Sequence, residues 1–237
     1  MSLEVNMIHL YHDDCFNIFP QLGDNSIELV LCDIPYGTTA CKWDTVLDLE
    51  RMWKELKRIT NIVVLNSMQP FTSSLISSNI KQFKYCWYWK KSKATGHLNA
   101  KLQPLRNIED ICVFYDKKVT YNPQYSLGTP YVGSCRKVHE GTYSSHGSTR
   151  EDNPGVRYPN QLLEIQGVNK PTHPTQKPVA LMEYLIKTYS NEGDTVLDFC
   201  MGSGTAGVAA KKLGRSFIGI EKEKEYYDIA VKRINEV

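Results

Sequence analysis

A short apolar run, residues 27–32, ends in the tetrapeptide Asp33-Ile34-Pro35-Tyr36. A run of this length and composition predicts a buried central strand of an α/β sheet. Proline stiffens the turn that follows, and Tyr36 is placed at the carboxyl end of the strand, where open α/β sheets bind ligands. Asp33 adds a carboxylate, which can only accept hydrogen bonds. The tetrapeptide therefore either forms a slot for a planar base with an exocyclic amine or is an ordinary Asp-x-Pro turn.

A second stretch, near the other end of the chain, contains Gly202, Gly204 and Gly207 in the spacing GxGxxG. It joins a predicted strand to a predicted helix, and Glu221 ends the next predicted strand roughly 20 residues later. Such a loop admits a ligand close to the backbone, and a terminal acid can bind ribose hydroxyls. Asp198, ahead of the glycines, would repel a pyrophosphate and suits a cationic ligand such as S-adenosylmethionine. A tight turn without a ligand is the alternative.

Strand-like and helix-like segments alternate along most of the chain, which predicts an α/β fold with a mostly parallel sheet and helices on both faces. Periodicity disappears over residues 116–170, as is typical of a functional or disordered segment. The predicted strands cover residues 7–11, 27–33, 62–65, 85–89, 108–115, 195–199 and 217–221. The predicted helices cover residues 15–22, 45–59, 70–79, 178–189, 205–213 and the stretch from 223.

Composition narrows the class of protein. The 237 residues, 41% of them hydrophobic, suffice for one α/β domain with an insertion. A net charge of +2 neither requires nor excludes a nucleic acid. Seven cysteines without a CxxC pair argue against a disulfide framework or a bound metal. With no recognisable signal peptide and no apolar run near the ~20 residues that span a bilayer, a cytoplasmic protein is expected.

Three motifs resemble those of one enzyme family. Residues 33–36 resemble the Asp-Pro-Pro-Tyr catalytic motif of amino-methyltransferases that act on DNA, and residues 198–205 resemble their cofactor motif, with one residue fewer before Phe199. Residues 173–178, His-Pro-Thr-Gln-Lys-Pro, match the signature that precedes the cofactor motif in the β-class of these enzymes. The resemblance covers nearly the whole chain and is weakest over residues 116–170.

The resemblance implies a Rossmann-like fold of S-adenosylmethionine-dependent methyltransferases, with a circularly permuted motif order and a mostly parallel seven-stranded sheet. It divides the chain into a catalytic part, residues 1–115, a target-recognition insertion, residues 116–170, and a cofactor-binding part of the same domain, residues 171–237. The implied cofactor is S-adenosylmethionine, and the implied partner is double-stranded DNA with a flipped target base. A homodimer is expected by analogy.

For the catalytic motif, the resemblance implies that Asp33 and the backbone carbonyl of Ile34 accept hydrogen bonds from the target amine. Pro35 shapes the turn, and Tyr36 stacks on the flipped base. Ile34 replaces the proline that is common in the family, which keeps the carbonyl but makes the turn less rigid. Aspartate at the first position favours adenine N6, whereas serine there would favour cytosine N4.

For the cofactor, the resemblance implies that Asp14 meets the adenine amine with Cys15 beside it, and that Glu221 binds the ribose. Thr175 and Lys177 would close the methionine end. The remaining expected cofactor-binding residues are Asp198, Phe199, Gly202, Ser203, Gly204 and Thr205.

Basic residues close to the aromatic strand 85–89 are candidates for phosphate contacts, and others lie in the variable region. The alternative is a solvated strand edge whose aromatic side chains point into the core. Glu109 is expected to pair with Arg106 rather than to catalyse. The candidate nucleic-acid-binding residues are Lys90, Lys91, Lys93, Arg106, Arg136 and Lys137.

The residues and the resemblance together predict a site-specific DNA adenine N6-methyltransferase of the kind found in restriction-modification systems. Cytosine N4, RNA or protein glutamine are alternative methyl acceptors. A catalytically silent nucleic-acid-binding module with the same fold is a second alternative, and a nicotinamide-dependent oxidoreductase is a third.

Overall fold

The computed structural model describes residues 7–37, 45–133, 152–168 and 176–237. They form two compact units, one made of the chain up to residue 122 together with residues from 161 onward, and the other of residues 123–160. The smaller unit lies inside the segment 116–170 that is expected to recognise the target, and that role stays a prediction.

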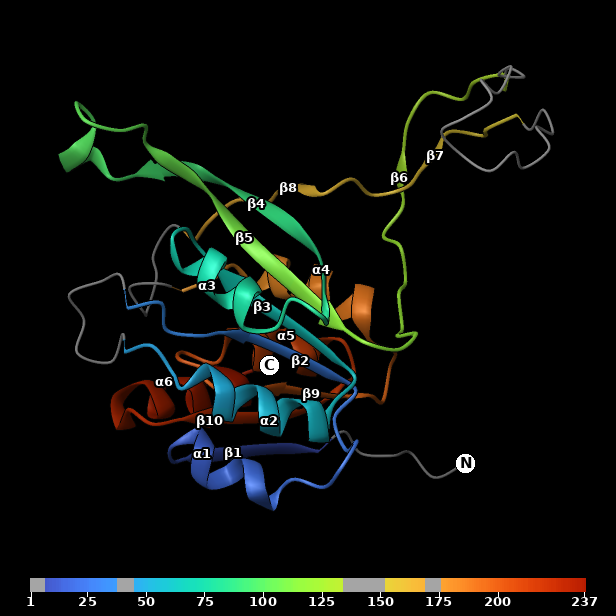
Figure 1. Cartoon of the computed structure of the whole chain (residues 1–237). Coiled ribbons are helices and arrows are strands. Elements are labelled where there is room, and N and C mark those ends of the chain that lie inside the picture. The colour runs from blue at the N-terminus through green and yellow to red at the C-terminus, as the bar shows by residue number, and fades with distance from the viewer. Residues whose placement is uncertain (1–6, 38–44, 134–151, 169–175) are drawn as a thin grey trace, which may run out of the picture. The chain divides into compact units, whose positions relative to one another are not determined.

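The larger unit is built on an eight-stranded sheet with the order β1-β10-β9-β2-β3-β5-β4-β8 (Figure 1). β1, β10, β9, β2 and β3 pair in parallel, and β5 is antiparallel to both of its neighbours. The predicted mostly parallel sheet is confirmed, but seven strands was one too few. The additional strand, β8, pairs with β4 and has only three residues, too few to show a period. The strands are β1 Ile8–His12, β2 Leu29–Asp33, β3 Ile62–Ser67, β4 Phe83–Thr95, β5 Arg106–Tyr115, β8 Leu162–Glu164, β9 Thr195–Asp198 and β10 Ser216–Glu221.

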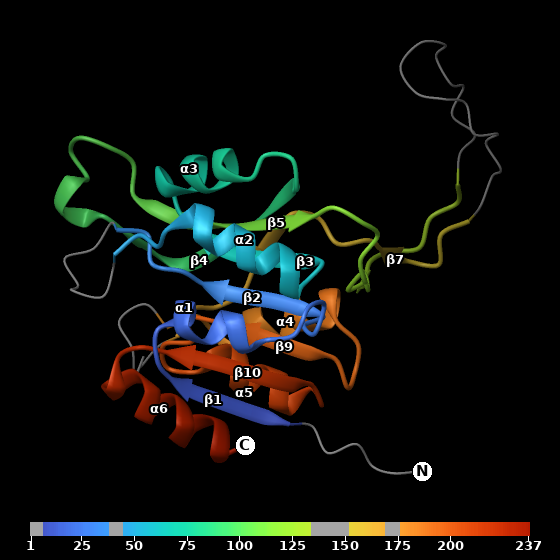
Figure 2. The same ribbon diagram turned by 60° about the horizontal axis from the view of Figure 1, so that its bottom comes forward.

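Helices cover both faces of the sheet (Figure 2). Side chains of α1, α2 and α3 share one hydrophobic core with one face, and side chains of α4, α5 and α6 share a second core with the other. Within the described part of the chain, none of the helices is long and apolar enough to cross a membrane. The helices are α1 Cys15–Ile18, α2 Leu49–Ile59, α3 Phe71–Ser78, α4 Val179–Tyr189, α5 Thr205–Lys212 and α6 Lys224–Asn235.

Helix α2 begins at Leu49 rather than at residue 45. The side chain of Asp48 accepts a hydrogen bond from the backbone N–H of Arg51 at 3.0 Å, so this aspartate is the cap that starts the helix. The prediction from sequence therefore started the helix about one turn too early. The buried side chains of the helix are Met52, Trp53, Leu56 and Ile59.

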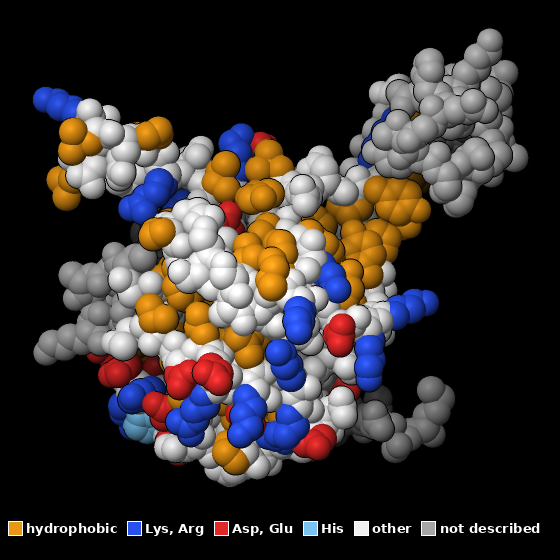
Figure 3. All heavy atoms as spheres, in the orientation of Figure 1, with side chains coloured by type: hydrophobic (Ala, Val, Ile, Leu, Met, Phe, Trp, Pro, Cys, Tyr) orange, Lys and Arg blue, Asp and Glu red, His pale blue; other side chains and the backbone are white. Residues whose placement is uncertain are grey.

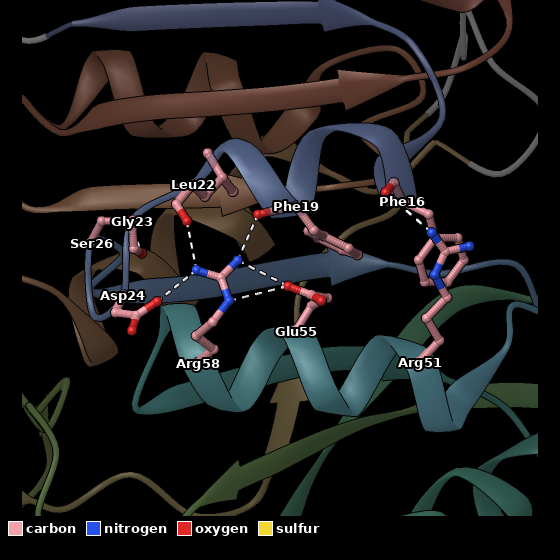
Figure 4. Close-up of polar contacts among 9 residues, drawn as sticks. All are labelled: Phe16, Phe19, Leu22, Gly23, Asp24, Ser26, Arg51, Glu55 and Arg58. Carbon is pink, nitrogen blue, oxygen red and sulfur yellow. Dashed lines mark hydrogen bonds and ion pairs between the residues drawn. The ribbon is translucent and has the colours of Figure 1, made fainter.

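Arg58, in the last turn of α2, fixes this helix to the segment between α1 and β2 (Figure 4). Its guanidinium donates to the backbone carbonyls of Leu22 and Phe19 at 2.7 and 2.8 Å. It also forms ion pairs with Asp24 at 2.7 Å and with Glu55 at 2.9 Å. A guanidinium is suited to this because its five donors have fixed directions. The contacts hold α2 against the connection that leads into β2 and so toward the site.

The parallel register brings the carboxyl ends of five strands to one edge of the sheet. His12 lies opposite Glu221, and Gly219 lies opposite Asp198. Asp33 lies opposite Asn66 on the other side. The polar residues that the sequence placed at strand ends therefore share one edge, which is where α/β sheets bind ligands.

The smaller unit contains a two-stranded antiparallel sheet made of β6, Ser126–Leu127, and β7, Val156–Arg157. The guanidinium of Arg157 lies 4.9 Å from the ring centroid of Tyr131, a cation–π contact. The rings of Tyr125 and Tyr158 pack edge to face at 5.0 Å. Among the described residues of this unit, the packing contacts are therefore between aromatic rings and a guanidinium.

Candidate active site

Asp33 is the last residue of β2, and the turn after it folds Tyr36 back over it. The hydroxyl of Tyr36 donates to Oδ1 of Asp33 at 2.5 Å, and the ring stacks on Phe71 with 5.6 Å between centroids. Ile34, between them, is buried. Burial and the charge of Asp33 raise the pKa of Tyr36, so its hydroxyl remains a donor.

Lys177, just before α4, lies on the other side of the same carboxylate. Its Nζ is 2.6 Å from Oδ2 of Asp33 and 3.4 Å from Oε2 of Glu109, and its side chain is only 7% exposed. Glu109 in turn pairs with Lys91 at 3.0 Å. The four side chains form a network of alternating charge that starts at the end of β2 and ends on β4.

The charges in this network fix one another's protonation. Burial acts to lower the pKa of Lys177, but the carboxylates of Asp33 and Glu109 together outweigh it and raise the pKa above its ordinary value. For Glu109 burial acts to raise the pKa, and the two lysines outweigh it, so that the pKa is lowered. Lys177 is therefore a cation and Glu109 an anion at neutral pH.

The partners of Glu109 require one correction. The expected pairing of Glu109 with Arg106 is wrong, because Glu109 pairs with Lys91 and Lys177. Strand alternation argues against the pairing with Arg106, since Glu109 is in phase with the buried Ile111 on β5 and Arg106 is not. Lys177 contacts the catalytic-motif aspartate and lines the cleft described below, and its expected place at the methionine end of a cofactor stays a prediction. Thr175 and most of the loop after Tyr36 lie outside the described residues.

The glycine loop joins β9 to α5 and packs against α6. Gly202 and Gly204 have positive φ angles of 51° and 74°. The N–H of Gly202 donates to Oε2 of Glu221 at 2.8 Å, which ties the loop to the end of β10. A Cβ on Gly204 would lie 2.9 Å from the Cβ of Ala230 in α6. Gly204 therefore allows the loop to approach α6 closely, and its own atoms do not line the cleft described below.

Asp198 lies beneath this loop at the end of β9 and is buried. Its Oδ1 accepts a hydrogen bond from the N–H of Cys200 at 3.2 Å. Burial raises the pKa of Asp198 to about 7, against the opposing effect of hydrogen bonds from Cys32 and Cys200. A carboxyl poised in this way is readily ionised by a nearby cation.

Asp14 caps α1 on the far side of Glu221. Its Oδ1 accepts from the N–H of Phe16 at 3.0 Å, and its Oδ2 lies 3.2 Å from Nζ of Lys222. Contact with Cys200 and burial raise the pKa of the neighbouring Cys15, which keeps this thiol protonated. The start of α1 and the glycine loop thus meet at the same edge of the sheet.

One cleft of about 740 Å³ joins the two motifs. Its volume is within the usual range for cofactor sites. Backbone N–H groups, carboxylates at three strand ends and apolar walls fit a ligand with a cationic end and a ribose. The predicted site residues that line the cleft are Asp14, Cys15, Asp33, Ile34, Pro35, Tyr36, Lys177, Asp198, Phe199, Gly202, Ser203, Thr205 and Glu221.

The predicted DNA-binding residues separate into three groups. Lys90 pairs with Glu164 at 2.6 Å, and Lys91 is drawn into the buried network by Glu109. Lys93, which lines the cleft, and Arg106 are exposed at the surface. Arg136 and Lys137 lie outside the described residues.

Comparison with known proteins identifies the family. The DNA methylase family model for N6 and N4 enzymes matches residues 27–232. The Type II methyltransferase M1.MboII of Moraxella bovis is 28% identical over 99% of this chain and 98% of that protein. M.HpaI of Haemophilus parainfluenzae is 30% identical over 90% of this chain and 70% of that protein.

Solved structures agree. The complex of M1.HpyAVI with S-adenosylmethionine matches with a TM-score of 0.64 and 27% identity, covering 96% of this chain and 100% of that one. The cytosine-N4-specific PvuII DNA methyltransferase, 16% identical, shares the fold with a TM-score of 0.69 over 97% of this chain and 86% of that one. The cofactor is S-adenosylmethionine, and the chain belongs to the β-class of DNA amino-methyltransferases.

Proposed function

We propose that this Type II DNA amino-methyltransferase acts on the N6 amine of adenine in double-stranded DNA. The observation that carries the proposal is the position of Asp33 in the cleft, with its carboxylate oriented by Lys177 and by the hydroxyl of Tyr36. Aspartate at the first position of the catalytic motif favours adenine.

The chemistry asks little of the protein beyond positioning and hydrogen bonding. The lone pair of an exocyclic amine is delocalised into the ring, so the amine is a poor nucleophile. Acceptors at Asp33 and at the carbonyl of Ile34 draw its hydrogens out of the ring plane and direct the lone pair toward the methyl group. When bound, S-adenosylmethionine supplies a methyl group that is already activated, so in-line positioning does much of the rest.

Proton release completes the reaction. The amine carries one proton too many after it takes the methyl group, and the nearest acceptor is the carboxylate of Asp33. Lys177 does not compete for this proton, because the carboxylates around it outweigh burial, raise its pKa and keep it protonated. Lys177 already occupies Oδ2, so the target amine shares Oδ1 with Tyr36 or displaces its hydroxyl.

The glycine-loop half of the cleft is proposed to hold the cofactor. Glu221 would bind the ribose hydroxyls, Asp14 would face the adenine amine, and the carboxylate of Asp198 would attract the cationic methionine end. The loop from Phe199 to Thr205 would surround the methionine part, with Gly204 contributing backbone shape. Tyr36 would stack on the target base once the base is flipped out of the duplex.

Cytosine N4 is the alternative acceptor, because the fold is shared with a cytosine-N4-specific enzyme. The same acceptors would serve a cytosine amine. The identity of the modified base therefore has to be measured directly.

Nucleoside mass spectrometry of plasmid DNA incubated with the protein and S-adenosylmethionine tests the proposal. N6-methyladenine is expected with the wild type and is expected to be absent with Asp33→Asn, a variant of nearly the same shape. Calorimetry should show that this variant still binds the cofactor, which separates lost chemistry from lost folding. N4-methylcytosine would overturn the base assignment, and no modified base on any DNA would overturn DNA as the substrate.

Two further expectations remain proposals of the same kind. Residues 116–170 would read the target sequence, with Arg157 among the described residues of that segment. A homodimer is the proposed assembly, and sedimentation of the full chain at micromolar concentration distinguishes it from a monomer.

A further inference from the structure

The hairpin formed by β4 and β5 extends beyond the sheet at the edge that holds Asp33. β3 ends at Ser67, opposite Asp110 of β5, and β8 pairs with β4 only as far as Lys90. The hairpin from Lys91 to about Ile108 therefore has no neighbouring strand on either side among the described residues. Figure 1 shows it projecting from the body of the larger unit.

The tip of this hairpin forms a hydrogen-bonded turn and presents apolar side chains to solvent. A 3₁₀ turn, His97–Asn99, follows Gly96, and the N–H groups of Leu102 and Gln103 donate to the carbonyl of Asn99 at 2.9 and 3.0 Å. Leu98 is fully exposed and Leu102 is 86% exposed. Figure 3 shows hydrophobic side chains gathered at this tip with a basic side chain beside them. Leucines held on a defined turn at such exposure require a partner or carry a cost in solubility.

The charge of the hairpin indicates what kind of partner fits. The stretch from Lys90 to Ile108 contains five lysine or arginine residues and no aspartate or glutamate. Two of them are paired at the base of the hairpin. The other three, Lys93, Lys101 and Arg106, are exposed and make no ion pair in the described structure. An apolar tip flanked only by positive charge suits a polyanion that also offers an apolar gap.

The base of the hairpin is connected to the catalytic motif. Lys93 and Thr95 line the same cleft as Asp33, and Glu109 on β5 contacts Lys177, which contacts Asp33. The turn at the tip follows directly in the chain after Thr95, a residue that lines the cleft. A nucleotide entering the cleft from a duplex would leave its gap in the base stack near this tip.

We propose that the tip of the hairpin is a wedge that enters the DNA beside the target base. Leu98 and Leu102 fill the space left by the flipped nucleotide, while Lys93, Lys101 and Arg106 hold the adjoining phosphates. Apolar side chains inserted between base steps are a known means of stabilising unstacked DNA. This inference rests on the proposed function, since it takes duplex DNA as the substrate.

The experiment compares two duplexes that differ only in the cost of flipping. The methylated site is first read by modified-base sequencing of plasmid treated with the wild type. Two short duplexes with that site are then made, one fully paired and one with an abasic nucleotide opposite the target base, which removes the pairing that flipping must break. The ratio kcat/KM is measured for the wild type, for Leu98→Ala/Leu102→Ala and for Ile80→Ala. Ile80 is also exposed, but it precedes β4 and so lies at the opposite end of that strand.

The double variant should lose about tenfold or more in kcat/KM on the paired duplex and less than about threefold on the abasic duplex. Ile80→Ala should match the wild type on both. Equal loss on the two duplexes, or no loss on either, overturns the wedge while leaving the methyltransferase intact. Conversion of a dimer to a monomer by the double variant, seen by sedimentation, would make the tip a subunit contact and would also overturn it. If plasmid treated with the wild type carries no modified base, the proposed function itself is overturned before any duplex is made.

Discussion

The Nζ of Lys177 lies 2.6 Å from Oδ2 of Asp33, although the two residues are 144 positions apart in the chain. The contact joins the start of α4 to the end of β2 and connects the catalytic motif with the signature that precedes the cofactor motif. Glu109 binds the same ammonium from β5. Lys177 thus positions the carboxylate of Asp33, which is proposed to bind the target amine, and Glu109 balances the charge of Lys177.

Glu109→Gln should slow methyl transfer without weakening cofactor binding. The loss of one anion lowers the pKa of Lys177, so the lysine deprotonates at a lower pH and Asp33 loses its partner sooner. We expect kcat to fall about tenfold at pH 8 and the alkaline limb of the pH–rate profile to shift to lower pH. KM for S-adenosylmethionine should stay within about twofold.

The matched control for this change is Glu164→Gln, which removes the carboxylate that pairs with Lys90 on the exposed side of β4. It should leave the pH–rate profile unchanged, because surface pairs of this kind contribute little. The positioning role of Glu109 would be refuted by a profile that keeps its alkaline limb in Glu109→Gln, or by an equal shift in Glu164→Gln.

Tyr36 combines a ring that stacks with a hydroxyl that binds Asp33, and two substitutions separate these roles. Tyr36→Phe keeps the ring against Phe71 and loses only the hydrogen bond to Oδ1 of Asp33. It should retain activity within about fivefold, since a single hydrogen bond contributes roughly 1 kcal/mol. Tyr36→Ala also loses the stacking surface and should lose about a hundredfold or more in kcat/KM. Equal activity of the two variants would exclude base stacking by this residue.

The pKa of Asp198, raised to about 7 by burial, predicts that the affinity for the cofactor depends on pH. A cationic ligand end binds the ionised carboxylate, so the affinity for S-adenosylmethionine should rise with pH by up to about tenfold per unit below pH 7 and level off above it. Calorimetry between pH 5.5 and about 8.5 measures this slope. In Asp198→Asn the slope should be smaller, and what remains would report Glu221, whose pKa burial also raises.

In the protein without ligand, Asp198 should make the free energy of unfolding fall as the pH rises, which is the opposite of its effect on cofactor affinity. The pKa of Asp198 is higher in the folded state than its ordinary value of 3.8, so its contribution is most favourable below that pH. It is lost as the pH rises through about 7. The difference in the free energy of unfolding between wild type and Asp198→Asn should therefore change between pH 4 and about 7 and stay constant above it. A constant difference throughout would show that Asp198 has an ordinary pKa.

The fold and most of the cleft could be predicted from sequence because both depend on patterns among residues that are neighbours in the chain. A strand end is indicated by the apolar run before Asp33 and again by the spacing of Gly202 and Gly204. Parallel strands then bring these ends to the same edge of the sheet. The contacts that orient Asp33 could not be found in this way. Lys177 and Glu109 meet it through packing between segments that are distant in sequence, and such ion pairs leave no periodic signal. The eighth strand was missed for a different reason, since three residues show no pattern.

Gly204 offers a test of whether the close approach of the glycine loop to α6 shapes the cofactor site. Gly204→Ala places a Cβ at a φ angle of +74° and 2.9 Å from the Cβ of Ala230, so it adds both backbone strain and a collision. Gly193→Ala is the matched control, because Gly193 has a φ angle of +87° but nothing within 4 Å of a Cβ. The control should lose about 1–2 kcal/mol of stability from strain alone and keep its affinity for S-adenosylmethionine. Gly204→Ala should lose more stability, by thermal unfolding, and at least about tenfold in affinity, because the loop must move away from α6 to relieve the contact. If both variants bind the cofactor equally well, the loop can relax without changing the site, and its proposed contacts to the methionine end would have to be abandoned.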